Sequence, residues 1–558
     1  MTDHPAAQAR PASATPASTA SAVGPARRVP VAFAALGGLV AAGTALATGE
    51  LPAGLLNGLP SPVAAVGSAA IDFAPPGSKD VVISLFGTND KTAILVLVTL
   101  VVLALGAGIG LLARRRLAFA GWAIVALVAV GGLASLRDPT ATGPLVVIAA
   151  ALEAGIGLQA LVVLLAAAPR GAAPRPERPT DASDLRGRRG FLLQAGALGA
   201  LALVGGAVGR TMLSGRADAT AGDAFGGGTG SNGSGGANAR LTIRQAVDPA
   251  PAPGPDASFN VPGITPVIVP NDQFYRIDTE LITPSVDVSG WSLRVFGMVD
   301  KEVNLTFAEL VQLPLIERYV TIACVSNEVG GNLVGNAKWT GPKLADVLAM
   351  AGVQAGATQI VPRSVDGWTA GFPTSWLHDP AHPRDAVIAV KMNDAPLPAE
   401  HGFPARLIVP GLYGYVSATK WLKEIQLTTL EAIDAYWVPR GWAKEAPILT
   451  QSRIDVPHDG GSVNAGPVAV AGVAWAPDRG ISKVEVRVDR GAWQTATLAT
   501  ELSAATWVQW KWVWQAASGQ HILEVRATDG TGAVQTDRVT PPDPDGARGH
   551  HQIAVQVA

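Results

Sequence analysis

Long apolar runs in the first 210 residues set the strongest constraint on how this chain folds. A helix needs about 20 apolar residues to cross the hydrocarbon core of a bilayer. The run TAILVLVTLVVLALGAGIGLL meets that requirement without a charged residue, and four other runs are of similar length. We therefore predict an α-helical membrane module with about five spans, at roughly 31–48, 92–112, 118–136, 144–168 and 191–209.

Arginines mark alternate ends of these runs. Arg27 and Arg28 precede the first run, arginines at 114–116 separate the second from the third, and six more precede the fifth. Basic loops stay in the cytoplasm under the positive-inside rule. We therefore expect residues 1–30 to be a disordered cytoplasmic N-terminus, and everything after residue 209 to lie on the outer face of the cytoplasmic membrane.

The segment before the fifth run reads SDLRGRRGFLLQAGALGALALVGGAVG. Its paired arginines, Arg188 and Arg189, are followed by Gly, Phe and a moderately apolar run, and resemble a twin-arginine export signal placed internally. Such a signal is typical of domains that fold around a cofactor before export. The alternative is that both arginines are ordinary cytoplasmic charges.

Changes in composition predict the remaining domain boundaries. Residues 31–168 would form a four-span transmembrane module, and 169–214 would hold the basic loop, the signal and the fifth span. Residues 215–258 contain GGGTGSNGSGGANA and DPAPAPGPDA, which predict a linker that cannot pack and leaves the outer module free to reorient. We expect a mixed α+β domain over 259–446 and an all-β immunoglobulin-like sandwich over 447–558.

Short β-rich runs separated by Gly and Pro support this division. Thr306 and Glu309 have the spacing of a capping box, and Gly352 follows the helical run LADVLAMA. In the last 110 residues, Trp510, Trp512 and Trp514 occupy alternate positions, which is typical of a strand. Several strands at turn-separated intervals favour a sandwich.

Charge and metal-ligating residues exclude several classes of function. Because the chain has 42 Lys and Arg residues and 44 Asp and Glu residues, it has no net positive charge with which to bind nucleic acid. Cys324 is the single cysteine, so Cys alone cannot ligate an iron–sulfur cluster. No His lies within a predicted span, which argues against a bis-His haem there. We expect no nucleic-acid partner, no haem and no iron–sulfur cluster.

Cys324 ends the apolar strand RYVTIA and precedes a glycine-rich stretch. A strand end that opens into a loop can present a side chain to a bound group. Three interpretations stay open: a nucleophile with a base such as His378, a buried small hydrophobe, or a soft thiolate ligand to a metal whose other ligands come from a cofactor.

A second candidate cluster lies in KMNDAPLPAEHGFPARLIVPGLYGYVSATKWL. His401, Arg406 and Lys420 stand there among Gly and Pro residues. Cationic and donor side chains of this kind suit an anion such as phosphate, and Arg adds a bidentate fork. The alternative is that they are solvated loop residues.

These motifs together resemble the sulfite oxidase superfamily of molybdopterin-dependent oxidoreductases, and the apolar front end resembles a bacterial membrane-anchored subgroup. ACVSNEVGG matches the family's molybdenum-ligating cysteine motif, and MNDAPLPAEHGFPARLIVPG and KWL follow in the family's order. The resemblance implies a molybdopterin-binding oxidoreductase domain over 259–446. It also implies an immunoglobulin-like dimerisation domain over 447–558, and hence a homodimer.

The resemblance implies roles for individual residues. Cys324 would be the only protein ligand to molybdenum in a molybdenum–molybdopterin cofactor. His401, Arg406 and Lys420 would hold the pterin and its phosphate, and Tyr275 would belong to the pocket wall. Besides Tyr275, Arg276 would also line the pocket wall and bind the cofactor.

Departures from the family pattern concern the substrate. Members that oxidise sulfite usually carry Arg-Asn-His where this chain reads Arg276, Ile277 and Asp278, and an active-site Tyr where spacing places Trp368. We expect Arg276, Asp278 and Trp368 to join Cys324 as catalytic residues, and we expect the added carboxylate to disfavour the sulfite dianion.

The sequence thus predicts a membrane-anchored molybdopterin-dependent oxidoreductase that transfers an oxygen atom to or from a small substrate on the outer face of the cytoplasmic membrane. A sulfoxide or N-oxide reductase of the same fold is one alternative. A metal-free membrane-anchored binding module is another. With molybdenum as the only redox centre, electrons would pass to or from a separate carrier.

Overall fold

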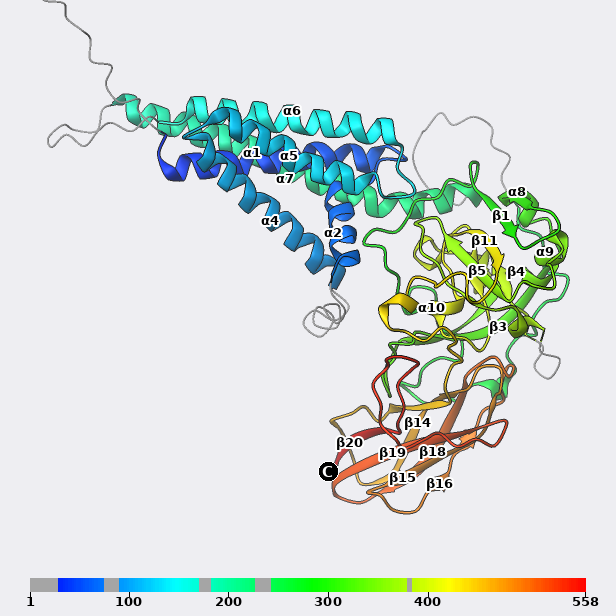
Figure 1. Ribbon diagram of the computed structural model, residues 1–558. Coiled ribbons are helices and arrows are strands. Elements are labelled where there is room, and N and C mark those ends of the chain that lie inside the picture. The colour runs from blue at the N-terminus through cyan, green and yellow to red at the C-terminus, as the bar shows by residue number, and fades with distance from the viewer. Residues whose placement is uncertain (1–28, 75–89, 170–181, 226–241, 379–383) are drawn as a thin grey trace, which may run out of the picture.

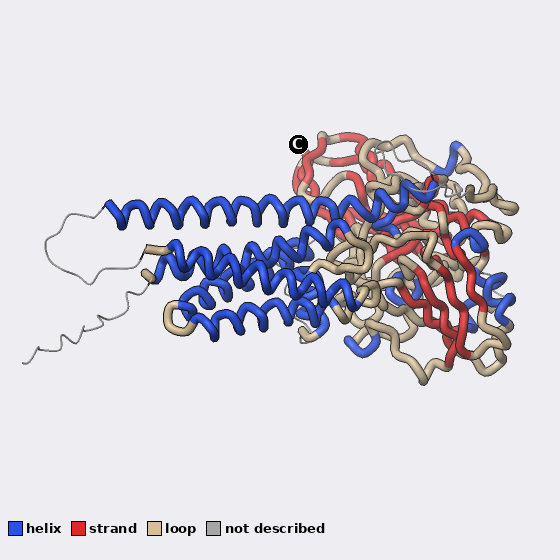
Figure 2. Tube along the Cα trace, turned by 90° about the horizontal axis from the view of Figure 1, so that it is seen from above, coloured by secondary structure: helices blue, strands red, loops and turns tan. Residues whose placement is uncertain are grey.

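The computed structural model describes residues 29–74, 90–169, 182–225, 242–378 and 384–558. An elongated helical module leads into two stacked β-rich domains, and the chain ends in the second of them (Figure 1). Seen from above, the helices project from one side of the β-rich part (Figure 2).

Within the described part of the chain, five helices are long and apolar enough to cross a membrane, which confirms the number and approximate position of the expected apolar helices. They run side by side, with α1 packed against α4, α6 and α7 (Figures 1 and 2). A shorter helix, α2, was not expected, because its 11 residues form no long apolar run. The bounds are α1 (Val31–Leu55), α2 (Pro62–Asp72), α4 (Asp90–Ala113), α5 (Leu117–Ser135), α6 (Gly143–Ala167) and α7 (Ala182–Phe225).

Small residues allow α1 and α4 to approach closely. A Cβ atom added at Gly38 would lie 2.1 Å from the carbonyl oxygen of Gly106, so neither helix tolerates a larger side chain at this crossing. Large apolar side chains instead point outward, with Leu97 61% and Leu203 77% exposed. Small residues between helices and large apolar residues outside are typical of helices surrounded by lipid.

The expected linker over 215–258 is wrong in its boundaries. Helix α7 continues to Phe225, so residues 215–225 are helical. Residues 226–241, with the Gly/Ser-rich run, lie outside the described residues, as do 1–28 of the expected N-terminus. The Pro-rich part packs on the next domain, where the Val247 amide donates to the Leu315 carbonyl at 2.8 Å. A Pro-rich segment still packs when a neighbouring strand accepts its remaining backbone donors.

The first β-rich domain contains three sheets and few helices, as expected of a mixed α+β fold. The sheet orders are β2-β1-β11-β5-β6, β3-β4-β8-β9 and β10-β7. The strands are β1 (Ser292–Gly297), β2 (Val303–Thr306), β3 (Leu315–Ala323), β4 (Val334–Pro342), β5 (Gln359–Ser364), β6 (Phe372–Pro373), β7 (Val387–Ala389), β8 (Lys391–Met392), β9 (Ala395–Pro396), β10 (Arg406–Ile408) and β11 (Leu422–Thr428). The helices are α8 (Phe307–Leu310), α9 (Leu344–Ala351) and α10 (Gly414–Ser417).

Local sequence signals explain two of these helices. The capping box between Thr306 and Glu309 is formed and starts α8. Gly352 ends α9 with φ of 71°, a backbone conformation that side chains with a Cβ rarely adopt.

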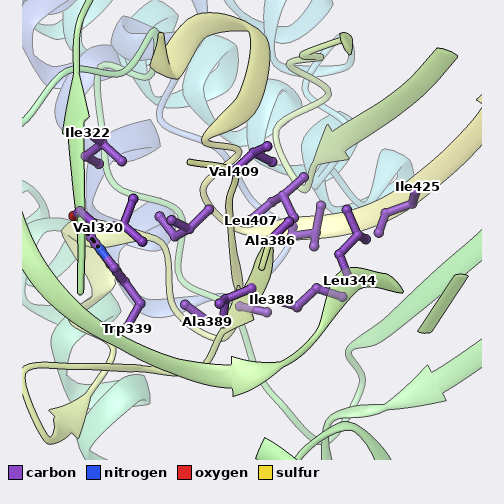
Figure 3. Close-up of a cluster of buried hydrophobic side chains, with 14 of the residues drawn as sticks. Val320, Ile322, Trp339, Leu344, Ala386, Ile388, Ala389, Leu407, Val409 and Ile425 are labelled. Atoms are coloured by element: carbon purple, nitrogen blue, oxygen red, sulfur yellow. Dashed lines mark hydrogen bonds between the residues drawn. The ribbon is translucent and has the colours of Figure 1, made fainter. Parts of the chain in front are cut away.

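A single apolar core lies between the sheets of this domain. Figure 3 shows side chains of β3, β4, β7 and β10 pointing toward one another, among them Val320, Trp339, Ile388 and Leu407, all of them buried. The Trp339 indole Nε1 donates to the Val320 carbonyl at 3.2 Å, so its polar atom is satisfied within the core. This core holds the strand ends from which the candidate site is built.

The second β-rich domain is a sandwich of two sheets, ordered β12-β14-β18-β17 and β13-β20-β19-β15-β16. Trp510 and Trp514 from one sheet and Val484 and Leu523 from the other share one buried cluster. The strands are β12 (Gln451–Val456), β13 (Gly461–Val463), β14 (Gly466–Trp475), β15 (Ile481–Val488), β16 (Gln494–Thr495), β17 (Thr497–Leu498), β18 (Val508–Ala516), β19 (Gly519–Asp529) and β20 (His551–Val557).

Candidate functional site

A cavity of about 860 Å³, measured with its open mouth, brings together most of the residues singled out in the sequence. Residues that lie far apart in the chain meet here, since Tyr275, Cys324 and Lys420 face the same space. The lining residues are Tyr275, Ile277, Asp278, Thr279, Cys324, Val325, Ser326, Ser364, Asp366, Trp368, Arg406, Gly414, Tyr415, Ala418, Lys420, Trp421, Trp437 and Trp442.

Cys324 lies directly after β3, where a tight turn presents it to the cavity. Its amide donates to the Leu333 carbonyl at 2.9 Å, and its own carbonyl accepts from the Asn327 amide at 3.1 Å. Burial raises the pKa of the thiol, although hydrogen bonds from Ser326 oppose the shift. His378 does not line the cavity, so the nucleophile interpretation loses that base.

Arg406, which lines the cavity, and His401, which does not line it, form a buried cluster. Arg406 begins β10, is 5% exposed and donates from Nη1 to the His401 carbonyl at 3.2 Å. His401 Nε2 lies 2.8 Å from the Asn271 carbonyl, so this nitrogen carries the proton. Burial, reinforced by Arg406 and Lys420, lowers the pKa of His401 to about 3 and keeps the imidazole neutral. Burial likewise lowers the pKa of Arg406, to about 10, at which the guanidinium remains charged near neutral pH.

Asp278 and Lys420 form a buried ion pair in the cavity wall. Lys420 Nζ donates to Asp278 Oδ2 at 3.0 Å and to the Glu400 carbonyl at 2.8 Å. Arg276 Nε donates to the same carboxylate oxygen at 3.0 Å, and Lys91 of the helical module donates to the other oxygen. Burial alone would raise the pKa of Asp278, but Lys420, Lys91 and Arg276 together hold it well below its usual range. Asp278 is therefore ionised and paired on both oxygens.

Arg276 does not occupy the position expected of it. Its guanidinium is 34% exposed, reaches Asp278 and Thr283, and does not line the cavity. The expectation that Asp278 disfavours a dianion is also incomplete, because cations pair with both oxygens of this carboxylate. The direction of the Arg276 side chain and the pairing of Asp278 do not follow from the sequence, because both depend on which side chains face each other after folding.

Aromatic side chains form much of the remaining wall. Tyr275 stacks on Phe274 with ring centroids 5.3 Å apart, and burial raises the pKa of its phenol, so it stays protonated. Trp368 lines the cavity, as expected, and its amide donates to Asp366 at 2.9 Å. Burial also raises the pKa of Asp366, and the negative charges of Asp278 and Asp138 add to that effect.

Several cavity residues escaped the sequence analysis. Tyr415 lies in GLYGYVSATKW, and Trp437 and Trp442 lie in YWVPRGW, where a gathering of aromatic residues among Gly and Pro was the available signal. Asp366 stands two residues before Trp368 and could have been found with it. Lys91 offered no signal, because it precedes an apolar run and reads as a flanking charge.

Comparison with known proteins identifies the family. Residues 280–437 match the family described as "Oxidoreductase molybdopterin binding domain". The uncharacterized oxidoreductase YuiH of Bacillus subtilis is 33% identical over 156 residues, which cover 28% of this chain and 74% of that protein. This chain belongs to the molybdopterin-binding oxidoreductases of the sulfite oxidase superfamily.

Other relatives match a longer part of the chain. Human mitochondrial sulfite oxidase is 30% identical over 322 residues, which cover 49% of this chain. The chain spans only 58% of the length of that relative. The crystal structure of the sulfane dehydrogenase SoxCD from Paracoccus pantotrophus overlaps 59% of this chain and 94% of that one, with a TM-score of 0.47 and 21% identity.

The residues of the cavity fit the molybdopterin that the family implies. Arg406 Nε and Trp368 Nε1 in the cavity lining, and Nδ1 of the adjoining His401, are buried and make no hydrogen bond within the described chain. Leaving a buried polar atom unpaired costs about 1 to 3 kcal/mol, so such atoms indicate a polar group that binds here. A pterin with its phosphate offers both acceptors and donors, and the Cys324 thiol offers a soft ligand for its metal.

Proposed function

We propose that this protein is a membrane-anchored oxidoreductase that transfers an oxygen atom to or from a small substrate on the outer face of the cytoplasmic membrane. The observation that carries the proposal is the single cysteine, Cys324, facing one cavity with Arg406 and Lys420. A thiolate suits the metal, and the two cations suit the pterin phosphate. Five apolar helices support the anchor, and the arginine pattern supports the outward orientation.

The cofactor supplies the two-electron chemistry of oxygen-atom transfer when it is bound. Cys324 would hold its metal, and His401, Arg406 and Lys420 would hold the pterin. Trp437 and the neighbouring aromatic residues keep bulk water out, which strengthens electrostatic contacts in the cavity.

Two further side chains have roles in this scheme. Trp368 Nε1 has no hydrogen-bond partner among the described residues and can donate to a substrate oxygen in the cavity. Asp366, whose pKa is raised by burial, can hold a proton. Insertion of a water-derived oxygen atom into a substrate releases two protons, and Asp366 can accept one of them. The reverse reaction would use the same residues.

The proposal extends to partners. Because Cys324 is the only cysteine, we propose that electrons pass to or from a separate carrier. By resemblance, we also propose that the sandwich over 447–558 is immunoglobulin-like and mediates a homodimer.

Cys324→Ser tests the proposal directly. Serine is nearly isosteric but scarcely ionised near neutral pH, so it should remove the bond to the metal while the fold persists. Oxygen-atom transfer, assayed with sulfite, dimethyl sulfoxide and trimethylamine N-oxide and artificial electron partners, should be lost. A variant that melts like the wild type and retains both molybdenum and turnover would refute the assignment.

A further inference from the structure

Lys91 brings a charged group of the helical module to the wall of the candidate cavity. Lys91 lies in the first turn of α4, and its Nζ donates to Asp278 Oδ1. The Asp278 side chain is 5% exposed and lines the cavity, whereas the Lys91 side chain is 27% exposed. A residue outside the cofactor-binding domain therefore contacts the cavity wall.

This contact belongs to a wider interface that seats the segment carrying Asp278. Ile282 packs against an apolar cluster of the helical module, and Ser285 lies 2.9 Å from Thr220 of α7, hydroxyl to hydroxyl. Tyr436, which precedes the cavity residue Trp437, donates to Asp72 of α2 at 2.9 Å. The interface therefore holds the helical module against the cofactor-binding domain, close enough for the Lys91 side chain to contact Asp278.

Charged side chains of both signs meet at this wall. Asp278 accepts from Lys91, Lys420 and Arg276, Arg406 adds a fourth cation to the cavity region, and the Asp366 carboxyl group lines the same cavity. Lys420 and Arg276 both donate to Asp278 Oδ2, so among the described residues Lys91 is the one donor to Asp278 Oδ1. Without Lys91, a bare carboxylate oxygen would lie in a wall that is shielded from water, where repulsion of an anion is strong.

We propose that Lys91 is a positioning residue that acts through Asp278 and makes the cavity favour oxyanion substrates over neutral ones. The inference rests on the proposed function in taking this cavity as the substrate chamber. It also gives the helical module a role beyond anchoring, because the module supplies part of the charge that selects the substrate.

The test compares binding of two small probes to the full-length protein in detergent. Sulfate is a dianion, and dimethyl sulfone is a neutral molecule of similar tetrahedral shape. Lys91→Met removes the charge but keeps the length of the side chain. For a unit charge about 10 Å from a dianion at an effective dielectric constant of about 20, we expect the Kd of sulfate to rise by about two orders of magnitude at low salt. The Kd of dimethyl sulfone should change less than about twofold.

Two control variants separate this role from a structural one. Lys91→Arg restores the charge and should bind sulfate like the wild type. Arg116→Gln removes an exposed charge from the same helical module, beside Phe119 and beyond the far end of α4 from Lys91, and should leave sulfate binding unchanged.

The inference is overturned if Lys91→Met binds sulfate as the wild type does, if Arg116→Gln weakens binding equally, or if Lys91→Met loses both probes together. The binding assay needs no turnover, and molybdenum content is measured in parallel. Failure of the Cys324 assignment would appear as retained molybdenum and turnover in Cys324→Ser, and is therefore distinguishable from failure here.

Discussion

Arg406→Met should loosen the hold of the protein on its pterin. Arg406 is 5% exposed, its Nη1 donates to the His401 carbonyl at 3.2 Å, and its guanidinium lies 5.3 Å from the centre of the Trp339 ring. Its Nε has no partner within the described chain. Methionine fills a similar volume without charge, so the substitution removes the unpaired donor and the hydrogen bond to His401 together.

The size of the effect follows from the lost interaction. A hydrogen bond to a charged group contributes about 1.5 to 3 kcal/mol, and each 1.4 kcal/mol corresponds to about a tenfold change in affinity. We therefore expect the pterin to bind about 10- to 150-fold more weakly. The measurement is pterin per protein, read by fluorescence after acid release, before and after prolonged dialysis.

A matched substitution provides the control. Arg363 is 41% exposed, lies 3.4 Å from Glu424 and does not line the cavity, so Arg363→Met should retain its pterin. Thermal melts of both variants show whether the domain stays folded. If Arg406→Met keeps the full pterin content through dialysis at the wild-type rate, Arg406 does not hold the cofactor and the reasoning from its unpaired Nε is wrong.

Two further predictions follow from other residues. The pKa of His401 falls from about 6.5 in the unfolded chain to about 3 in the folded protein. Between these two pH values the unfolded chain binds a proton that the folded protein does not bind. The free energy of unfolding therefore decreases as the pH falls below about 6.5, by about 2 kcal/mol at pH 5. Chemical denaturation at pH 7 and 5 should show a larger loss for the wild type than for His401→Gln, and equal losses would contradict the assignment. If Arg188 and Arg189 direct export, replacing both by Lys keeps the charge but should leave the cofactor domain inaccessible to protease added outside the cell. Normal accessibility of the domain to the protease would instead support the alternative, in which Arg188 and Arg189 are ordinary cytoplasmic charges.

Features that depend on near neighbours in the chain were predictable from sequence. The apolar helices follow from continuous runs of apolar residues, and the start of α8 follows from Thr306 and Glu309, which are three residues apart. Cys324 and Arg406 were found in the same way, because each lies at a strand end within a motif that the sequence displays. The end of α7 was missed because residues 215–225 carry no strong signal for either helix or linker.

The charge of the cavity was decided only by the tertiary structure. Lys91 and Asp278 are 187 residues apart, and no periodicity or motif relates them. The sequence contains the carboxylate, but whether it repels or orients a substrate depends on the cations that folding brings to each of its oxygens. Arg276 shows the same limit, since its position beside Tyr275 predicted a cavity residue and its side chain instead points to Thr283. Patterns along the chain determine which elements form, whereas burial and long-range pairing determine which charges remain available to a ligand.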